Sequence, residues 1–397
     1  MRAECQFAKA GQGLFYNGLL VDDKGKFFSF VYDCGTSNGA TVLKDSITDY
    51  KELAGKRLDL LALSHFHQDH VSHIPELIKG LELGTVVIPF IRPETRLLIA
   101  AQYEDIENDT ERIQFYNDPL MYFIAHGAER VVTAHSDEDN SNFFGNIESR
   151  EYPNGNKEYR ETVNQIVMSG HQINTQVTSC FMSKGDEYSG KFQAIIPHYQ
   201  WEFRFKNVHY DKINNSLRNE LSKLLEKHNN SFEEILRNKS YIRQLREIYK
   251  DNFEDNLNET SLVMLSRPLR QDGWFIGNSY CQINCKNKVS TFVLGDLTIG
   301  PEMFYYWFKN FLCSAPLVFQ LPHHGANLKV HTSWCGWLKK IGQHCHNPIS
   351  FVVSYGIKNR YGHPMLCNIC SQDEKCYMPL MLEFVNERKD FCYTILY

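Results

Sequence analysis

The sequence predicts an α/β fold whose strands end in metal-binding side chains. The chain has 397 residues, of which 43% are hydrophobic, and many of these fall in short apolar runs of strand length. Four such runs lead into segments that carry histidine or aspartate, and they end at Leu63, Leu294, Leu321 and Tyr355. Because catalytic groups of layered α/β proteins gather at one set of strand ends, we expect these four ends to meet.

Composition and charge limit the classes of function. Charged residues make up 22% of the chain, and the formal net charge at pH 7 is -5. These values are ordinary for a globular protein and give no overall attraction to nucleic acid or to an anionic membrane. A nuclease would therefore need local basic residues. The length allows one large domain with insertions or two domains, and we expect a single domain over residues 1–397.

The N-terminus and the cysteines indicate a compartment. No long apolar core of a signal peptide follows Met1, and no apolar stretch approaches the ~18 residues that suggest a membrane span. We therefore expect a cytoplasmic protein that makes no membrane contact. Most of its 12 cysteines should then be reduced and act as small core residues.

Paired strands are expected at the start of the chain. Residues 1–35 contain apolar runs separated by the turn Asp22–Lys26, which is typical of a hairpin. The run Phe27–Tyr32 reads as a strand that ends at Asp33. Residues 41–56 are expected to be helical.

The most informative stretch follows the next apolar run, Leu60–Leu63, in the pattern H-x-H-x-D-H. It contains His65, His67, Asp69 and His70. Imidazole nitrogens and a carboxylate on one short loop are ligands for zinc or a similar metal. The two alternating histidines can point the same way off an extended backbone, and the last two residues can face a second metal. The alternative is a surface loop of solvated histidines.

Elements then alternate up to a polar segment. We expect a short helix at Val71–Ile78, a strand at Val86–Phe90, mixed helices over residues 95–128 and a strand at Val131–Val132. Residues 136–162 are rich in Asp, Asn, Ser, Gly and Glu with few apolar residues. This composition predicts a long polar surface loop.

A helical insertion is expected in the second half, over residues 204–256, after a strand at Phe192–Ile196. Leucines recur at helical spacing from Leu217 to Leu225, and Ser231–Glu234 is a capping box. The insertion could cover the site, contact a substrate, or bind a second copy or a protein partner. The alternative is that it simply packs on the domain.

Further strands and motifs complete the pattern. Strands are expected at 258–265, 274–276, 291–294, 317–321, 351–355 and 391–396. The motifs that follow them are Gly295-Asp296, Pro322-His323-His324-Gly325 and Gly362-His363-Pro364.

The order of these motifs, with Asn258 and Ser261 as an N-x-x-S element, resembles the metallo-β-lactamase-fold hydrolases. Within that superfamily the chain looks closest to the metallo-β-lactamase-like domain of the competence DNA-uptake protein ComEC and its soluble relatives. The resemblance covers residues 11–100 and 190–365, except for the helical insertion. It implies a four-layer αβ/βα sandwich with a dinuclear metal site. A departure is Ala326, which stands where a serine is usual.

The resemblance also implies roles for individual residues. His65 and His67 would hold the first cation, Asp69 and His70 the second, and Asp296 would bridge them. His363 would complete the second site. His324, or less favourably His323, would bind metal or stabilise charge on the substrate. The residues implied to be catalytic are Asp69, His324 and His363. The expected cofactors are two divalent ions, zinc first and manganese as the alternative. Asp33 would orient the loop rather than bind metal.

One ligand and one further site are open at this stage. Many superfamily members carry another histidine before the bridging aspartate, and His198 is the best candidate by position, with His126, His135 and His171 less favoured. The default is a structural histidine. Near the C-terminus Cys367, Cys370 and Cys376 have partial spacing for a structural zinc site, and the alternative is a set of free thiols.

The resemblance implies a metal-dependent phosphodiesterase or nuclease. Charge building up on a phosphodiester could be neutralised by the metals, His324 and the nearby Lys358 or Arg360. The acidic net charge disfavours a long duplex, so a small, cyclic or single-stranded substrate is equally open. Two alternatives remain: hydrolysis of a lactam, thioester or other carboxylic ester, and a metal-binding module without turnover.

Overall fold

The computed structural model describes most of the chain. The described residues are 1–39, 41–136, 165–167, 185–189, 191–209, 213–253, 257, 260–269, 273–277, 282–285, 290–297, 318–326, 350–360, 362–364 and 381–397. The polar loop expected at 136–162 lies outside the described residues except for Ser136. The other predicted residues that lie outside them are His171, Asn258, Cys367, Cys370 and Cys376.

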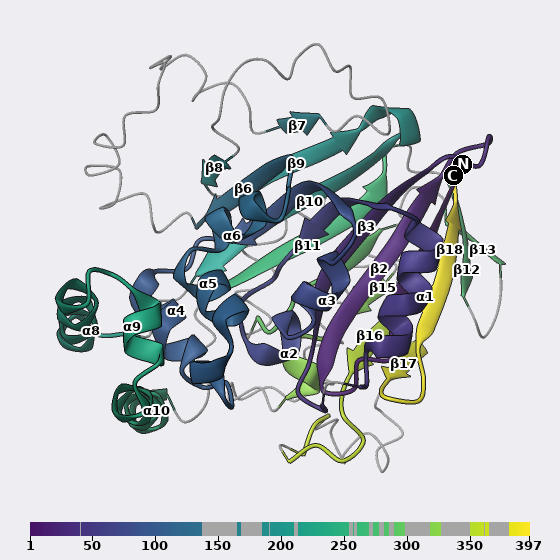
Figure 1. Ribbon diagram of the computed structural model, residues 1–397. Helices are drawn as coiled ribbons and strands as arrows, with labels where there is room; N and C mark the ends of the chain where they lie inside the picture. The colour runs from purple at the N-terminus through teal and green to yellow at the C-terminus, as the bar shows by residue number, and fades with distance from the viewer. Residues whose placement is uncertain are drawn as a thin grey trace, which may run out of the picture.

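Ten strands of the described chain form the first sheet, in the order β13-β12-β18-β1-β2-β3-β4-β5-β6-β8 (Figure 1). Their bounds are β1 Arg2–Phe7, β2 Gly13–Val21, β3 Phe27–Thr36, β4 Arg57–Ala62, β5 Glu82–Pro89, β6 Arg130–His135, β8 Gly185–Ser189, β12 Gly273–Gly277, β13 Gln282–Cys285 and β18 Phe391–Leu396. Strands β3 to β6 run parallel to one another. Their long apolar runs fit this arrangement, because parallel strands are covered on both faces.

Eight strands of the described chain form the second sheet, in the order β17-β16-β15-β14-β11-β10-β9-β7. Their bounds are β7 Gln165–Val167, β9 Lys191–Ile196, β10 Trp201–His209, β11 Thr260–Pro268, β14 Thr291–Val293, β15 Val318–Gln320, β16 Ser350–Ser354 and β17 Met381–Val385. Strands β14, β15 and β16 are parallel. Each of them is followed by one of the motifs that the sequence singled out.

Helices cover the outer face of the first sheet, where α1 and α3 lie over β1 to β3 in Figure 1. The described helices are α1 Lys44–Ala54, α2 Gln68–Val71, α3 Ile74–Ile78, α4 Pro93–Ala100, α5 Thr110–Asn117, α6 Pro119–Ala125, α8 Asn215–Lys227, α9 Phe232–Leu236 and α10 Lys239–Phe253. One hydrophobic core joins these helices to the first sheet, and a second fills the space between the two sheets. The helical layer expected on the far face of the second sheet lies outside the described residues.

The helical insertion begins later than the predicted residue 204. Residues Trp201–His209 form β10, which pairs along its whole length with β11. The apolar side chains of this strand alternate with charged ones, so one face enters the core between the sheets. The helical part is therefore α8 to α10, and the predicted cap is confirmed, since Ser231 accepts a hydrogen bond from the Glu234 backbone N–H.

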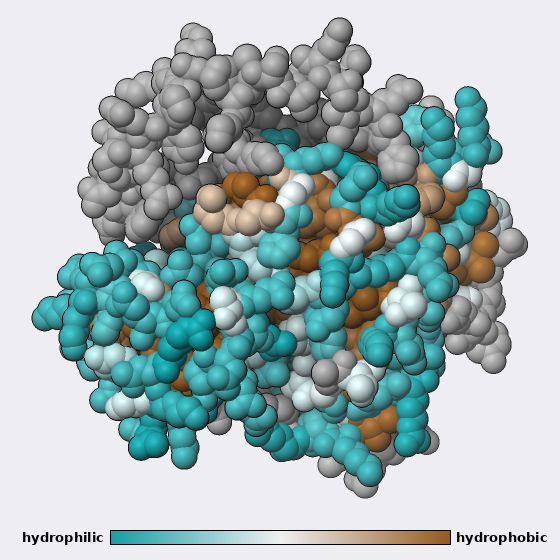
Figure 2. Space-filling view, viewed as in Figure 1, coloured by the Kyte–Doolittle hydropathy of each residue, from teal (hydrophilic) through white to brown (hydrophobic). Residues whose placement is uncertain are grey.

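The insertion buries its apolar side within the molecule. Leu217, Leu221 and Leu225 of α8 belong to the same core as α4 and α5. Figure 2 shows mainly hydrophilic residues on the outward side of this region, with hydrophobic ones visible between the elements. No helix in the described parts of the chain is both long enough and apolar enough to cross a membrane.

Candidate metal centre

The loop after β4 is held against the first sheet by a buried carboxylate. Asp33, three residues before the end of β3, accepts hydrogen bonds from the Ser64 backbone N–H at 2.7 Å and from Ser64 Oγ at 2.6 Å. Its Oδ2 lies 2.7 Å from Nδ1 of His70. Asp33 has a φ of 57°, which aspartate tolerates better than most residues. Its expected role as an orienting residue is consistent with these contacts.

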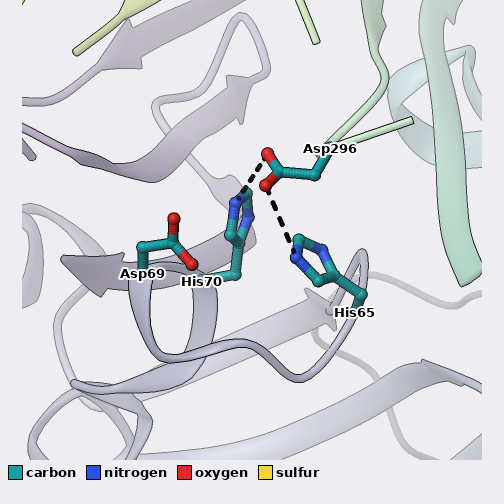
Figure 3. Close-up of side chains that lie close together, drawn as sticks. All are labelled: His65, Asp69, His70 and Asp296. Carbon is teal, nitrogen blue, oxygen red and sulfur yellow. Dashed lines mark hydrogen bonds and ion pairs between the residues drawn. The ribbon is translucent and has the colours of Figure 1, made fainter. Parts of the chain in front are cut away.

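Four ligand-type side chains converge next to this loop. The ligand atoms of His65, Asp69, His70 and Asp296 all lie within 4.8 Å of one another. Figure 3 shows His65, from the loop after β4, and His70, from α2, pointing at the Asp296 carboxylate, which comes from the segment after β14. The structure thus brings together residues that are more than 220 positions apart, as the motif order predicted.

The two oxygens of Asp296 face different pairs of histidines. Oδ1 lies 3.0 Å from Nε2 of His70 and 3.6 Å from Nε2 of His324. Oδ2 lies 3.8 Å from Nε2 of His65 and 4.0 Å from Nε2 of His323. The carboxylate therefore stands between two sets of nitrogen donors. The sequence analysis expects Asp296 to bridge two cations, and this arrangement leaves an oxygen facing each set of donors.

Two ring nitrogens of the site are buried without a hydrogen-bond partner among the described residues. They are Nε2 of His65 and Nδ1 of His67. His65 is only 2% exposed, and its other nitrogen lies 2.8 Å from Ser64 Oγ. Buried polar atoms are nearly always paired in native proteins, and a cation would satisfy both lone pairs. The donor set and these orphaned atoms fit a site for divalent metal ions.

Burial and charge divide the histidines into two classes. Burial lowers the pKa of His65 well below its usual range and lowers that of His67 to about 4, so both rings are neutral at pH 7. Burial also opposes protonation of His70 and His324, but the nearby carboxylates, Asp296 first, outweigh it and raise their pKa. In return, His70 overcomes the effect of burial and holds the pKa of Asp296 well below its usual range.

The loops of the second sheet are fixed by Gln320, a residue that the sequence analysis did not single out. Its side chain is 3% exposed. Oε1 accepts from the Leu294 N–H at 2.7 Å, while Nε2 donates to the carbonyls of Gly295 at 3.1 Å and Leu321 at 2.7 Å. One amide thus ties the segment that carries Asp296 to the one that carries the two adjacent histidines.

Close contact between the two sheets requires glycine at position 295. Gly295 has a φ of 58°, and a Cβ there would lie 2.6 Å from Cβ of Ser64 and 2.8 Å from Oγ of Ser261. Ser261 donates to the Leu294 carbonyl at 2.6 Å. The Gly-Asp motif therefore combines a ligand with the only residue type that allows its loop to approach the first sheet.

His323, His324 and His363 lie beside this cluster. Nε2 of His324 is 3.0 Å from Asp69 Oδ2, and its Nδ1 is 2.9 Å from the Ser354 carbonyl. The ring of His363 lies 5.7 Å from that of His323. Asn359 holds the His363 backbone through bonds of 3.0 Å to its N–H and 2.6 Å to its carbonyl. The last motif is thus positioned at the site, although His363 is not within the tight group of four.

His198 is separated from the site. Its Nε2 lies 2.8 Å from Oδ2 of Asp22, the residue that follows the last residue of β2. The side chain of His198 is 53% exposed. Gly13, the first residue of β2, lies against the Asp69 backbone. A nine-residue strand spans roughly 26 Å at about 3.3 Å per residue, so His198 is not a ligand of this cluster.

The other histidines considered for that place differ in position. His126 caps α6, where its Nδ1 lies 2.8 Å from the Tyr122 carbonyl. His135 ends β6, at the same edge of the sheet as the metal loop, and its ring stacks on Phe90 at 4.4 Å. Neither belongs to the group of four converging side chains.

Sequence comparison gives a family match for part of the chain. Residues 12–142 match the family model of the metallo-beta-lactamase superfamily. This span is about a third of the chain and contains the whole loop from His65 to His70. The mixed α/β structure with two packed sheets and helices is consistent with the metallo-β-lactamase sandwich that the sequence predicted. No curated protein is similar enough in sequence to be counted as a relative.

Two solved structures give distant matches. The metallo-beta-lactamase fold protein YhfI from Bacillus subtilis is 8% identical, with a TM-score of 0.35, and the match covers 98% of this chain and 99% of that one. A long form RNase Z from yeast is 9% identical, with a TM-score of 0.35. That match covers 89% of this chain and 36% of the RNase Z. At such scores neither likeness bears on function.

Proposed function

We propose that this protein is a metal-dependent hydrolase that cleaves phosphodiester bonds. The observation that carries the proposal is the placement of Asp296, whose two carboxylate oxygens face separate pairs of histidines. A buried carboxylate with nitrogen donors on both sides is suited to hold two cations rather than one. The match of residues 12–142 to a superfamily of largely metal-dependent hydrolases supports the same reading.

The residues divide between two cation positions. His65 and Oδ2 of Asp296 would hold one ion, with His67, whose ring lies 5.0 Å from that of His65, as a further ligand from outside the group of four. Asp69, His70 and Oδ1 of Asp296 would hold the other ion. Bound divalent ions would supply Lewis acidity and lower the pKa of a water molecule. Zinc is the expected ion, because nitrogen and carboxylate side chains are its usual ligands. The protein's own contribution is to keep the histidines neutral or able to lose a proton, and to shield the site from bulk water.

Cationic and polar groups at the rim suit an anionic substrate. Lys358 and Arg360 are exposed on the loop that also carries His363. Burial lowers the pKa of His363 to about 4, so its ring is neutral at pH 7 and can donate or accept a hydrogen bond. The net charge of -5 disfavours long duplexes, which rely on many phosphate contacts. A short, single-stranded or cyclic phosphodiester fits this distribution of charge.

The test combines metal analysis with two substrate classes. Purified protein should contain up to two equivalents of zinc or manganese and should cleave a chromogenic phosphodiester, with plasmid DNA as the second substrate. His67→Ala and Asp296→Ala should lose metal and turnover. His198→Ala is the matched control, because this histidine lies at the other end of β2, and it should behave as wild type.

The outcomes separate the competing functions. Cleavage of a β-lactam or a thioester, with phosphodiesters left intact, would replace the proposed substrate class while keeping the metal site. Full metal occupancy without turnover on either class would favour a binding module. Wild-type activity in Asp296→Ala would contradict the site as assigned.

A further inference from the structure

The helical insertion reaches the metal loop through one side chain. Tyr249 lies on α10 and is 4% exposed. Its hydroxyl oxygen is 3.1 Å from Nε2 of His67, a residue 182 positions earlier in the chain. The same hydroxyl accepts a hydrogen bond of 3.3 Å from the Leu257 backbone N–H. The insertion therefore contacts a predicted ligand directly.

The helix that carries this tyrosine is fixed to the rest of the domain. Ile242, Leu245 and Phe253 of α10 are buried in the core shared with the first sheet. Arg246 donates from Nε to the Ala101 carbonyl at 2.6 Å and from Nη2 to the Tyr103 carbonyl at 2.5 Å. These carbonyls lie at and just beyond the end of α4, which lies beside α10. Such anchoring leaves the hydroxyl little freedom to move.

The hydrogen bonds around the hydroxyl favour one tautomer of His67. An imidazole that binds a metal ion is neutral and carries one N–H and one lone pair, so only one of its two nitrogens can donate a hydrogen bond. If Nε2 carries the proton, it donates to Tyr249, and the lone pair of Nδ1 faces the site. If Nδ1 carries it, a buried N–H is left without an acceptor among the described residues, which is unfavourable. Only the first tautomer leaves Nδ1 able to bind a cation.

We propose that Tyr249 is a positioning residue of the metal centre, which fixes the orientation and tautomer of His67 and makes the helical insertion part of the site. This inference rests on the proposed function, because it requires His67 to hold a cation. Groups that orient a metal-binding histidine through its second nitrogen commonly change metal affinity by about 10–100-fold when they are removed. A hydroxyl buried only for packing would have no such effect.

The first test measures metal affinity rather than activity. Tyr249→Phe keeps the ring and removes the hydroxyl. In competition with a chromophoric chelator, it should bind one zinc equivalent about 10–100-fold more weakly than wild type. Tyr241→Phe is the matched control on the same helix, since its hydroxyl contacts Lys227 and His228 instead of the site, and it should bind zinc as wild type does. A melting curve shows whether each variant is folded.

The second test examines the mechanism of the effect. In a His67→Ala background, Tyr249→Phe should cause no further loss of zinc affinity, because the tyrosine acts through that histidine. NMR of metal-free protein labelled with ¹⁵N-histidine should show His67 as the Nε2–H tautomer. This last measurement uses the wild-type chain, so it holds even if a variant fails to fold.

The failures of the two proposals are distinguishable. If wild-type protein binds no divalent metal, the proposed function falls. If wild type binds zinc and Tyr249→Phe binds it equally tightly, the inference about Tyr249 is overturned while the metal site stands. Finding His67 as the Nδ1–H tautomer in the wild type would overturn it as well.

Discussion

Removing the side chain of Gln320 should loosen both loops of the second sheet that face the metal centre. Gln320→Leu keeps a side chain of similar size but leaves the Leu294 N–H and the Gly295 and Leu321 carbonyls without this partner. The Gly295 carbonyl still accepts from the His323 N–H at 3.1 Å, so two of these groups are left unpaired. Each costs about 1–3 kcal/mol, so the local cost is about 2 kcal/mol or more. The β14–β15 pairing ends at Phe292 and Phe319, so the ladder itself offers Leu294 no replacement.

Hydrogen–deuterium exchange followed by mass spectrometry gives a local measure of this change. At 1.4 kcal/mol per factor of ten, about 2 kcal/mol corresponds to roughly 30-fold faster exchange in the peptide that contains Leu294. Gln102→Leu is a control for the substitution, since that side chain makes a single bond, to the Leu98 carbonyl, and is only partly buried. Unchanged exchange in Gln320→Leu would show that the amide does not hold the two loops.

Two further predictions concern the carboxylate behind the loop and the effect of pH. Asp33→Asn keeps the shape and tolerates the positive φ, but it weakens the hold on the metal loop, so zinc affinity in a chelator competition should fall about 10–100-fold. The metal-free protein should lose thermal stability as the pH falls from about 6.5 to 4, because the unfolded chain binds protons to His67 and His363 in this range while the folded chain does not. The raised pKa values of His70 and His324 give stability that is complete below about 6.5, so they do not offset the loss. Double replacement of His67 and His363 by glutamine should reduce this dependence without abolishing it, because His65 and His323 also have lowered pKa values.

The elements that carry the ligands could be predicted because their signal is local. A strand buried on both faces is a continuous apolar run, and a metal loop concentrates its ligands within six residues. The loop His65–His70 and the Gly295-Asp296 motif both have this form. Their convergence followed from one rule, that parallel strands present their carboxyl ends at the same edge of a sheet.

The residues that support the ligands could not be predicted in this way. Gln320 is a single glutamine within an apolar run, and Tyr249 is one of several aromatic residues on an amphipathic helix. Each acts through contacts with segments that only the tertiary fold brings near, 25 or more positions away for Gly295 and 182 for His67. The strand Trp201–His209 is different. Its apolar residues alternate with charged ones at period two, so the signal was present although residues 204–209 were assigned to the helical insertion.

The two halves of the metal centre should differ in how their cations bind. His65 and His67 are neutral because burial lowers their pKa, so their lone pairs are available at pH 6 to 7. His70 has a raised pKa because Asp296 and the neighbouring carboxylates stabilise its proton, and a cation must displace that proton. The first equivalent of zinc should therefore bind with little proton release, and the second with more.

Calorimetric titration in two buffers of different ionisation enthalpy measures proton release for each equivalent. We expect the affinity for the second zinc to fall more steeply than that for the first as the pH is lowered from 7.5 to 6. Equal proton release by both equivalents would contradict the charge distribution, since it would mean that His70 is as free of its proton as His65. The asymmetry follows from Asp296 itself, because its Oδ1 lies 3.0 Å from one of these rings and its Oδ2 lies 3.8 Å from the other.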